Sequence, residues 1–164
     1  MIIGGQAVLL YGEPRLTRDI DITVGLGVDK VDRVLSVTKH LGLKTMVRNY
    51  RAFVNKTMVL PVIEPKTKIR VDFIFSFTEY EKQAIMHSRA VRLDNVSVRF
   101  ASLEDVIVHK VVAGRARDIE DVRAVVLKNP KYDTRYIVKW LKVLDRSAGA
   151  GLVAAFRKTV REGS

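Results

Sequence analysis

The chain has 164 residues, 48% of them hydrophobic, which is enough for one folded domain with a core and argues against disorder. Its 29 basic and 18 acidic residues give a net charge of +11, which favours polyanionic partners such as nucleic acid or nucleotides. Cysteine is absent, so disulfides, thiol catalysis and zinc–thiolate sites are excluded, and three scattered histidines argue against a histidine-based metal site. No apolar run approaches the ~20 residues of a membrane span, and the start lacks a signal peptide's basic leader, so we expect a cytoplasmic protein without membrane contact.

The first elements in chain order alternate between strand and helix. Residues 1–3 predict the tail of a strand, and residues 4–12 predict a glycine turn that opens a short helix. Polar and β-branched residues alternate over 19–26, which indicates a strand. Apolar residues recur at helical spacing over 28–42, and Gly42 is expected to end this helix.

The middle of the chain continues this mixed pattern. Two strands are predicted over 57–64 and 69–77, separated by a short proline-containing turn. Residues 78–88 predict a helix that begins with a capping box. Residues 89–100 predict a β-hairpin.

From Ser102 onward the pattern becomes helical, with helices predicted over 102–114, 118–129 and 133–145 and a weaker last segment from Gly151. We therefore expect an α/β (α+β) fold with two parts. Residues 1–101 form a mixed α/β core, and residues 102–164 form a C-terminal helical region packed on that core.

Three aspartates are the candidate catalytic and metal-binding residues. Asp19 and Asp21 are two positions apart on a predicted strand, so their side chains project from the same face. Two like charges this close repel unless a cation neutralises them, and Mg²⁺ prefers such oxygen ligands. Asp72 lies within a strongly apolar strand, where an unpaired carboxylate would be costly. If that strand lies beside residues 19–24, the three carboxylates can form a metal site for phosphoryl transfer.

Each carboxylate also has a purely structural interpretation. Asp19 and Asp21 could be a solvated strand start that is paired with Arg15 or Arg18. Asp72 could form a salt bridge to Arg70 on the same face of its strand. Taken singly, these alternatives stay open. The combination with the glycines described next favours the metal site.

Gly4 and Gly5 lie where a strand gives way to a helix. Without a Cβ atom the backbone can approach a phosphate closely, and the new helix offers free N–H groups. A glycine pair alone more often marks a tight turn. Arg15, Thr17 and Arg18 follow just before the carboxylates and could contact a triphosphate, although one of the two arginines could be only a surface charge.

The stretch "GGQAVLLYGEPRLTRDIDI" resembles the signature of the polymerase-β-type nucleotidyltransferase superfamily, and its form is most similar to the AbiEii-like toxin nucleotidyltransferases and their archaeal and bacterial relatives. The resemblance implies a nucleotidyltransferase-type mixed sheet flanked by helices. It also implies that the glycine turn holds the phosphates of an NTP. Two divalent metals, Mg²⁺ or Mn²⁺, would be bound by Asp19, Asp21 and Asp72.

A second segment, "SLEDVIVHKVVAGRARDIEDV", is similar to the family's Lys…Arg-x-x-Asp segment. Lys110 interrupts the apolar stripe of its helix, so it either snorkels to solvent or faces a cleft and contacts anions. We favour the cleft, mainly because of the resemblance. Arg117 is the further candidate for nucleotide binding, and Arg115 is expected at the surface. Asp118 and Asp121 lie near a helix N-terminus and suit its dipole.

These features predict a metal-dependent nucleotidyltransferase that transfers NMP to an acceptor hydroxyl, and the charge of +11 suggests RNA or tRNA as acceptor, with a protein as another possibility. A generally basic surface is the alternative interpretation of the charge. The alternative function is a non-catalytic module of toxin–antitoxin type that binds nucleic acid or a protein partner. Small-molecule modification is a third option, but the sequence shows no acidic or aromatic acceptor pocket. Only three residues precede Gly4, fewer than in relatives, and the apolar surface this would uncover favours a homo-oligomer.

Overall fold

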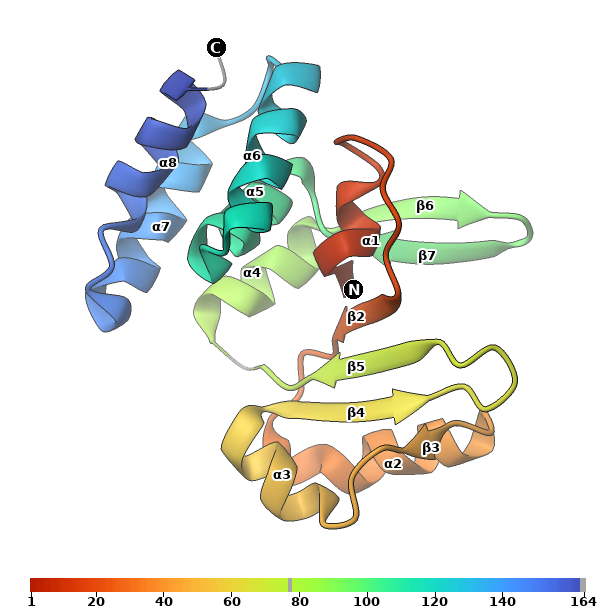
Figure 1. Cartoon of the computed structure of the whole chain (residues 1–164). Helices are drawn as coiled ribbons and strands as arrows, with labels where there is room; N and C mark the ends of the chain where they lie inside the picture. Colours follow the sequence, from red (N-terminus) through yellow and green to blue (C-terminus); the bar gives the residue numbers. More distant parts are fainter. Residues whose placement is uncertain (77, 163–164) are drawn as a thin grey trace. The chain divides into compact units, whose positions relative to one another are not determined.

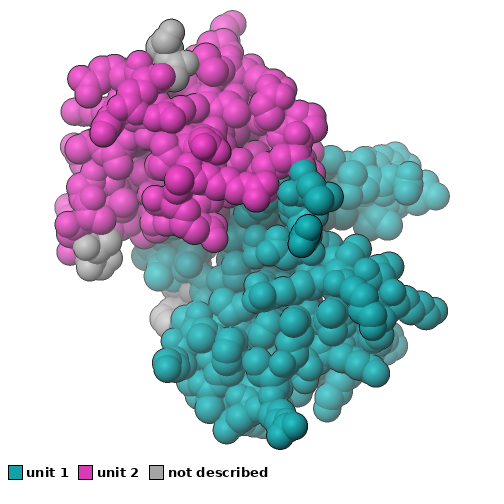
Figure 2. All heavy atoms as spheres, viewed as in Figure 1, with its two compact units in different colours: residues 1–6, 16–100 teal, residues 7–15, 101–164 magenta. Residues whose placement is uncertain are grey.

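The structure is a computed structural model that describes residues 1–76 and 78–162. The chain forms two compact units, one of residues 1–6 with 16–100 and one of residues 7–15 with 101–164 (Figure 2). The last residue of the strand predicted over 69–77 lies outside the described residues.

The first unit is built on one mixed sheet, whose strands have the order β3-β4-β5-β2-β1-β7-β6. The neighbours β4, β5 and β2 can be followed in Figure 1. Parallel pairing joins β2 to β5 and β1 to β7, and the other neighbours are antiparallel. The described strands are β1 Ile2–Ile3, β2 Asp19–Thr23, β3 Lys44–Thr45, β4 Val59–Ile63, β5 Arg70–Ile74, β6 Arg89–Leu93 and β7 Val96–Phe100.

The two faces of the central strands differ, because side chains alternate along a strand. On one face, Leu60 and Val62 of β4 stand opposite Phe73 and Val71 of β5, and all four are buried. The helices α2 (Val31–His40) and α3 (Tyr50–Thr57) and Phe75, which directly follows β5, supply the remaining buried side chains of this apolar cluster. The buried residues contributed by α2 and α3 are Val31, Val34 and Val54. The aspartates of β2 and β5 alternate with apolar neighbours and therefore occupy the opposite face.

Strand β3 and helix α3 were not predicted from the sequence. Asn49 caps α3, because its side-chain oxygen accepts a hydrogen bond from the backbone N–H of Ala52 at 3.2 Å. The helix ends at Met58, whose φ of 61° is left-handed, so β4 starts at Val59, two residues later than predicted. Tyr50, Phe53 and Val54 have the i, i+3, i+4 spacing of a helix, but eight residues hold only one such repeat, which is too short to identify the helix from sequence.

Helix α4 (Glu79–His87) begins with the predicted capping box. The hydroxyl of Thr78 accepts a hydrogen bond from the backbone N–H of Glu81 at 3.3 Å, and the carboxylate of Glu81 accepts one from the backbone N–H of Thr78 at 3.0 Å. These reciprocal bonds satisfy two N–H groups that a helix start leaves free.

The second unit is helical and contains the C-terminal part of the chain. Ser102 and Asp133 cap two of the helices through their side-chain oxygens, as expected for residues of these types. Four helices contribute buried apolar side chains to the core of this unit. They are α5 Leu103–Ala113, α6 Ala116–Lys128, α7 Thr134–Ala148 and α8 Leu152–Glu162. None of the helices in the described ranges is both long and apolar enough to cross a bilayer.

Residues 7–15 belong to this second unit, which the sequence did not predict. The short helix α1 (Gly4–Val8) begins in the first unit and ends in the second. The hydroxyl of Tyr11 donates to the carbonyl of Ala101 at 3.0 Å, and the side-chain amide of Asn129 donates to the carbonyl of Tyr11 at 2.7 Å. These hydrogen bonds join residues about a hundred positions apart, so no local sequence pattern could predict them.

Candidate functional site

The three predicted carboxylates project from one face of the sheet in the first unit. Strands β2 and β5 are parallel neighbours, with Asp21 opposite Asp72 and Asp19 opposite Arg70. Side chains of paired residues leave a sheet on the same side, and so do residues two apart on a strand. The condition set for the three carboxylates, that the strand of Asp72 lies beside residues 19–24, is therefore met.

Gly4 gives room to the carboxylate of Asp21. Its φ is +63°, and a Cβ at this position would lie 2.0 Å from the Oδ2 of Asp21, far inside any permitted contact. Glycine is thus required here both by its backbone conformation and by the side chain above it. The role of Gly4 and Gly5 in leaving space for phosphates, expected from the sequence, stays a prediction.

Arg70 binds Asp72 in the way that the sequence analysis left open. Its Nε donates to Oδ1 of Asp72 at 2.8 Å and its Nη2 donates to Oδ2 at 2.7 Å. These hydrogen bonds raise the pKa of the Arg70 guanidinium above its ordinary value, and the charges of Asp72, Asp19 and Asp21 add to the effect. The guanidinium therefore experiences all three carboxylates together.

The donor chemistry of this face suits Mg²⁺ or Mn²⁺, since both accept carboxylate oxygens. However, no group of three or more His, Asp or Glu side chains within residues 1–76 and 78–162 stands close enough to hold a metal ion without adjustment. Both oxygens of Asp72 bind Arg70, and Oδ2 of Asp21 occupies the space beside Gly4 that a Cβ would need. The three aspartates have the right ligand type for such a cation and share one face of the sheet. To bind it, Asp72 has to leave Arg70 and Asp21 has to turn away from Gly4.

The turn before β2 fixes the start of that strand. The hydroxyl of Thr17 donates to the carbonyl of Asp19 at 3.0 Å, and the side-chain amide of Gln6 approaches the same oxygen at 3.5 Å. Arg18 is exposed and forms no ion pair with any other described residue. The predicted contacts of Thr17 and Arg18 with a triphosphate stay predictions.

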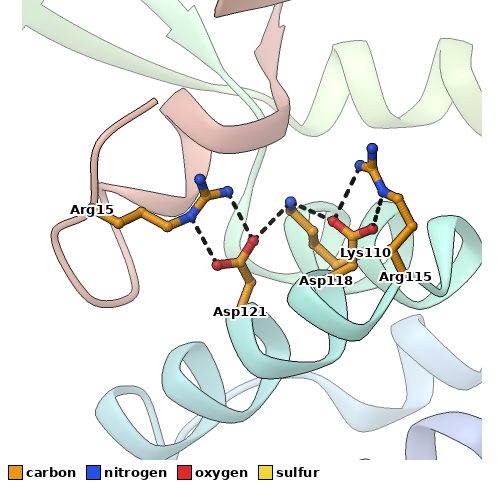
Figure 3. A network of polar contacts seen from close by, with 5 residues as sticks. All are labelled: Arg15, Lys110, Arg115, Asp118 and Asp121. Carbon is orange, nitrogen blue, oxygen red and sulfur yellow. Dashed lines mark hydrogen bonds and ion pairs between the residues drawn. The ribbon is translucent and has the colours of Figure 1, made fainter. Parts of the chain in front are cut away.

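The second unit contains a network of five charged side chains (Figure 3). Lys110 is at its centre and only 6% exposed. Its ammonium lies 2.7 Å from an oxygen of Asp118 and 2.8 Å from an oxygen of Asp121. Arg15 binds both oxygens of Asp121 at 3.0 Å, and Arg115 binds Asp118 at 2.6 Å.

The network gives Lys110 a role that the sequence analysis did not weigh. We expected its side chain either to reach solvent or to face a cleft, and instead two buried carboxylates hold it. Burial favours the neutral form of Asp118, but the hydrogen bonds from Arg115 and Lys110 outweigh it and hold the pKa of Asp118 below its ordinary value.

A sequence signal for this network exists. A lysine on the apolar face of a helix needs acidic partners, and Asp118 and Asp121 share one face of the next helix at i, i+3 spacing. Arg115, expected at the surface, has a side chain that is 76% exposed but still reaches Asp118. Arg117 is exposed and has no polar partner within the described part of the chain. Nucleotide binding by Arg15, Lys110 and Arg117 stays a prediction.

Comparison with known proteins supports the same fold. The model of a family described as nucleotidyltransferase of unknown function (DUF6036) matches residues 1–137. One similar solved structure is that of an antigenic nucleotidyltransferase-like protein from Paracoccidioides brasiliensis, with 15% sequence identity over 95% of this chain and 83% of that chain and a TM-score of 0.53. This likeness concerns the fold alone, and it confirms the predicted α/β architecture with C-terminal helices. No protein in the curated set matches the chain.

Proposed function

Since the chain belongs to the nucleotidyltransferase family whose model it matches, we propose that it transfers a nucleoside monophosphate from an NTP to an acceptor hydroxyl. The observation that carries the proposal is the strand register, in which Asp21 pairs with Asp72 on parallel neighbours and Asp19 shares their face. Three carboxylates on one face repel one another, and Arg70 alone offers them only one positive charge, which leaves room for a divalent cation.

In the proposed reaction the acceptor oxygen attacks the α-phosphorus of the NTP, and pyrophosphate leaves as its bridging bond breaks. Asp19, Asp21 and Asp72 would hold Mg²⁺ or Mn²⁺. Such a cation, when bound, supplies charge stabilisation for the phosphates and favours ionisation of the hydroxyl. Asp72 is the candidate general base that accepts the hydroxyl proton. For this role its carboxylate has to be released from Arg70.

The acceptor is proposed to be RNA, with tRNA as one candidate, because the net charge of +11 favours a polyanion. A protein acceptor is the other outcome that the same assay detects. The form of the glycine and Asp-x-Asp motif supports membership of the AbiEii-like toxin group within the superfamily, and a cognate protein partner would then be expected.

The test is incubation of the protein with each labelled NTP, Mg²⁺ or Mn²⁺ and total RNA, followed by separation of RNA from protein. We expect label in one of these two fractions, and we expect its loss in the Asp19→Asn, Asp21→Asn double variant without loss of the fold. Asp29→Asn is the matched control, because Asp29 is an exposed carboxylate of the same unit with Lys30 as its partner. Transfer by the double variant at the wild-type rate would refute the assignment.

A non-catalytic binding module is the second candidate, and one observation favours it. Arg70 already neutralises Asp72, and within the described ranges no acidic cluster is arranged to hold a metal. A binder would show RNA or protein binding that neither the Asp19, Asp21 double variant nor removal of divalent metal alters. Transfer of label from any NTP would exclude this alternative.

A further inference from the structure

Arg70 stands on the same sheet face as the three aspartates. It is paired with Asp19 across the β2–β5 ladder and lies two positions before Asp72 on its own strand. Both relationships direct its side chain to the carboxylate face. Of the four charged residues on this part of the sheet, Arg70 is the single cation.

The contact between Arg70 and Asp72 uses both carboxylate oxygens, at 2.8 and 2.7 Å. A bidentate arginine contact of this kind leaves few lone pairs in a direction that a metal ion could use. The two side chains differ in exposure, since Asp72 is 13% exposed and Arg70 is 47% exposed. The arginine can therefore turn away into solvent while the carboxylate stays in position.

We propose that Arg70 is an internal counter-ion that competes with the divalent cation for Asp72, so that the site accepts metal only when the guanidinium leaves. The inference rests on the proposed function, because it concerns the same three carboxylates. When no metal ion is bound, the positive charge of Arg70 offsets the repulsion among Asp19, Asp21 and Asp72 and so stabilises this face of the sheet. The raised pKa of the Arg70 guanidinium, caused first by its hydrogen bonds to Asp72, is consistent with this role.

The opposite role would be a purely positioning one, in which Arg70 orients Asp72 toward the metal. The two roles predict opposite results when the arginine is removed. A competitor weakens metal binding, so its loss tightens it. A positioning residue strengthens metal binding, so its loss weakens it.

The experiment measures Mn²⁺ binding without nucleotide, from the electron paramagnetic resonance signal of free Mn²⁺. We expect Arg70→Gln to bind Mn²⁺ roughly tenfold more tightly than the wild type, because a full positive charge a few ångströms from the ion is removed. Arg70→Lys keeps the charge but cannot make the bidentate contact, so an intermediate affinity is expected. It also provides a second variant if Arg70→Gln does not fold.

Arg51→Gln is the matched control. Arg51 forms an exposed ion pair with Asp32 at 2.7 Å in the same unit, and its removal should leave Mn²⁺ binding unchanged. Adding Asp72→Asn to Arg70→Gln should abolish the gain in affinity, since the released carboxylate is then lost. A gain that survives in this double variant would show that Asp72 is not the contested ligand.

The thermal midpoint gives a readout independent of binding and of activity. Arg70→Gln should melt below the wild type without metal and should gain more from Mn²⁺ than the wild type does. Equal or weaker Mn²⁺ binding by Arg70→Gln, with NMP transfer by the wild type intact, would overturn the inference about Arg70 alone. Absence of both Mn²⁺ binding and NMP transfer in all variants would overturn the proposed function with it.

Discussion

The carboxylate of Asp21 lies directly over Gly4, with Oδ2 in the space that a Cβ at position 4 would need. Gly4 lies at the start of the motif "GGQAVLLYGEPRLTRDIDI" and Asp21 near its end, with helix α1 and the following turn between them. The glycine is therefore part of how the acidic face is shaped, because any side chain at this position would push Asp21 away.

Gly4→Ala should displace Asp21 and lower NMP transfer about 100-fold, since a shift on the order of 1 Å at a reacting group has that effect. Gly42→Ala is the matched control. Gly42 also has a positive φ, +72°, but no atom lies within 4 Å of its Cβ position. Both variants should lose about 1–2 kcal/mol of stability from backbone strain, and only Gly4→Ala should lose activity. Equal activity of the two variants would contradict this account.

Lys110→Met should lower the free energy of unfolding by about 3–5 kcal/mol, because Asp118 and Asp121 would then share less positive charge in a buried position. The measurement is urea denaturation followed by circular dichroism. Lys158→Met removes an exposed lysine of the same unit, 3.8 Å from Glu162, and should change stability by at most about 0.5 kcal/mol. Similar effects of the two substitutions would show that the network contributes little.

Arg117→Gln and Arg15→Gln should separate nucleotide binding from stability. Arg117 is exposed, so its substitution should leave stability unchanged and raise the KM for NTP about tenfold if it contacts a phosphate. Arg15→Gln removes a bidentate partner of buried Asp121 and should cost about 1–3 kcal/mol of stability. Steady-state kinetics and urea denaturation measure the two effects. An unchanged KM in Arg117→Gln would remove Arg117 from the site.

The second unit should lose stability in acid through Asp118. Its pKa is lowered in the folded protein from the ordinary value of 3.8, because the hydrogen bonds from Arg115 and Lys110 outweigh burial. The unfolded chain therefore takes up the proton first. The resulting stabilisation is complete above about pH 5 and is lost as the pH falls through 3.8 and then through the lower folded value. The stability difference between wild type and Asp118→Asn, measured by urea denaturation, should shrink from pH 6 to pH 3.

A difference that stays constant or grows toward pH 3 would show that Asp118 does not stabilise the fold as a carboxylate.

Much of the sheet could be predicted because strand faces depend on local alternation. The spacing of Asp19 and Asp21 determines their common face, whereas the pairing of their strand with that of Asp72 became known only from the structure. The helices after Ser102 followed from their apolar periodicity. Helix α3 was not predicted because its eight residues hold only one helical repeat of apolar side chains.

The sequence by itself determined which residues share a face, since that depends on neighbours one to four positions away. Only the tertiary structure decided what each charged group binds. Arg15 contacts Asp121 across 106 positions of the chain, whereas Arg70 takes Asp72. From the sequence alone, each of these arginines could pair with any of several aspartates. The choice among them depends on which side chains the backbone brings within about 3 Å, and that is a property of the folded chain.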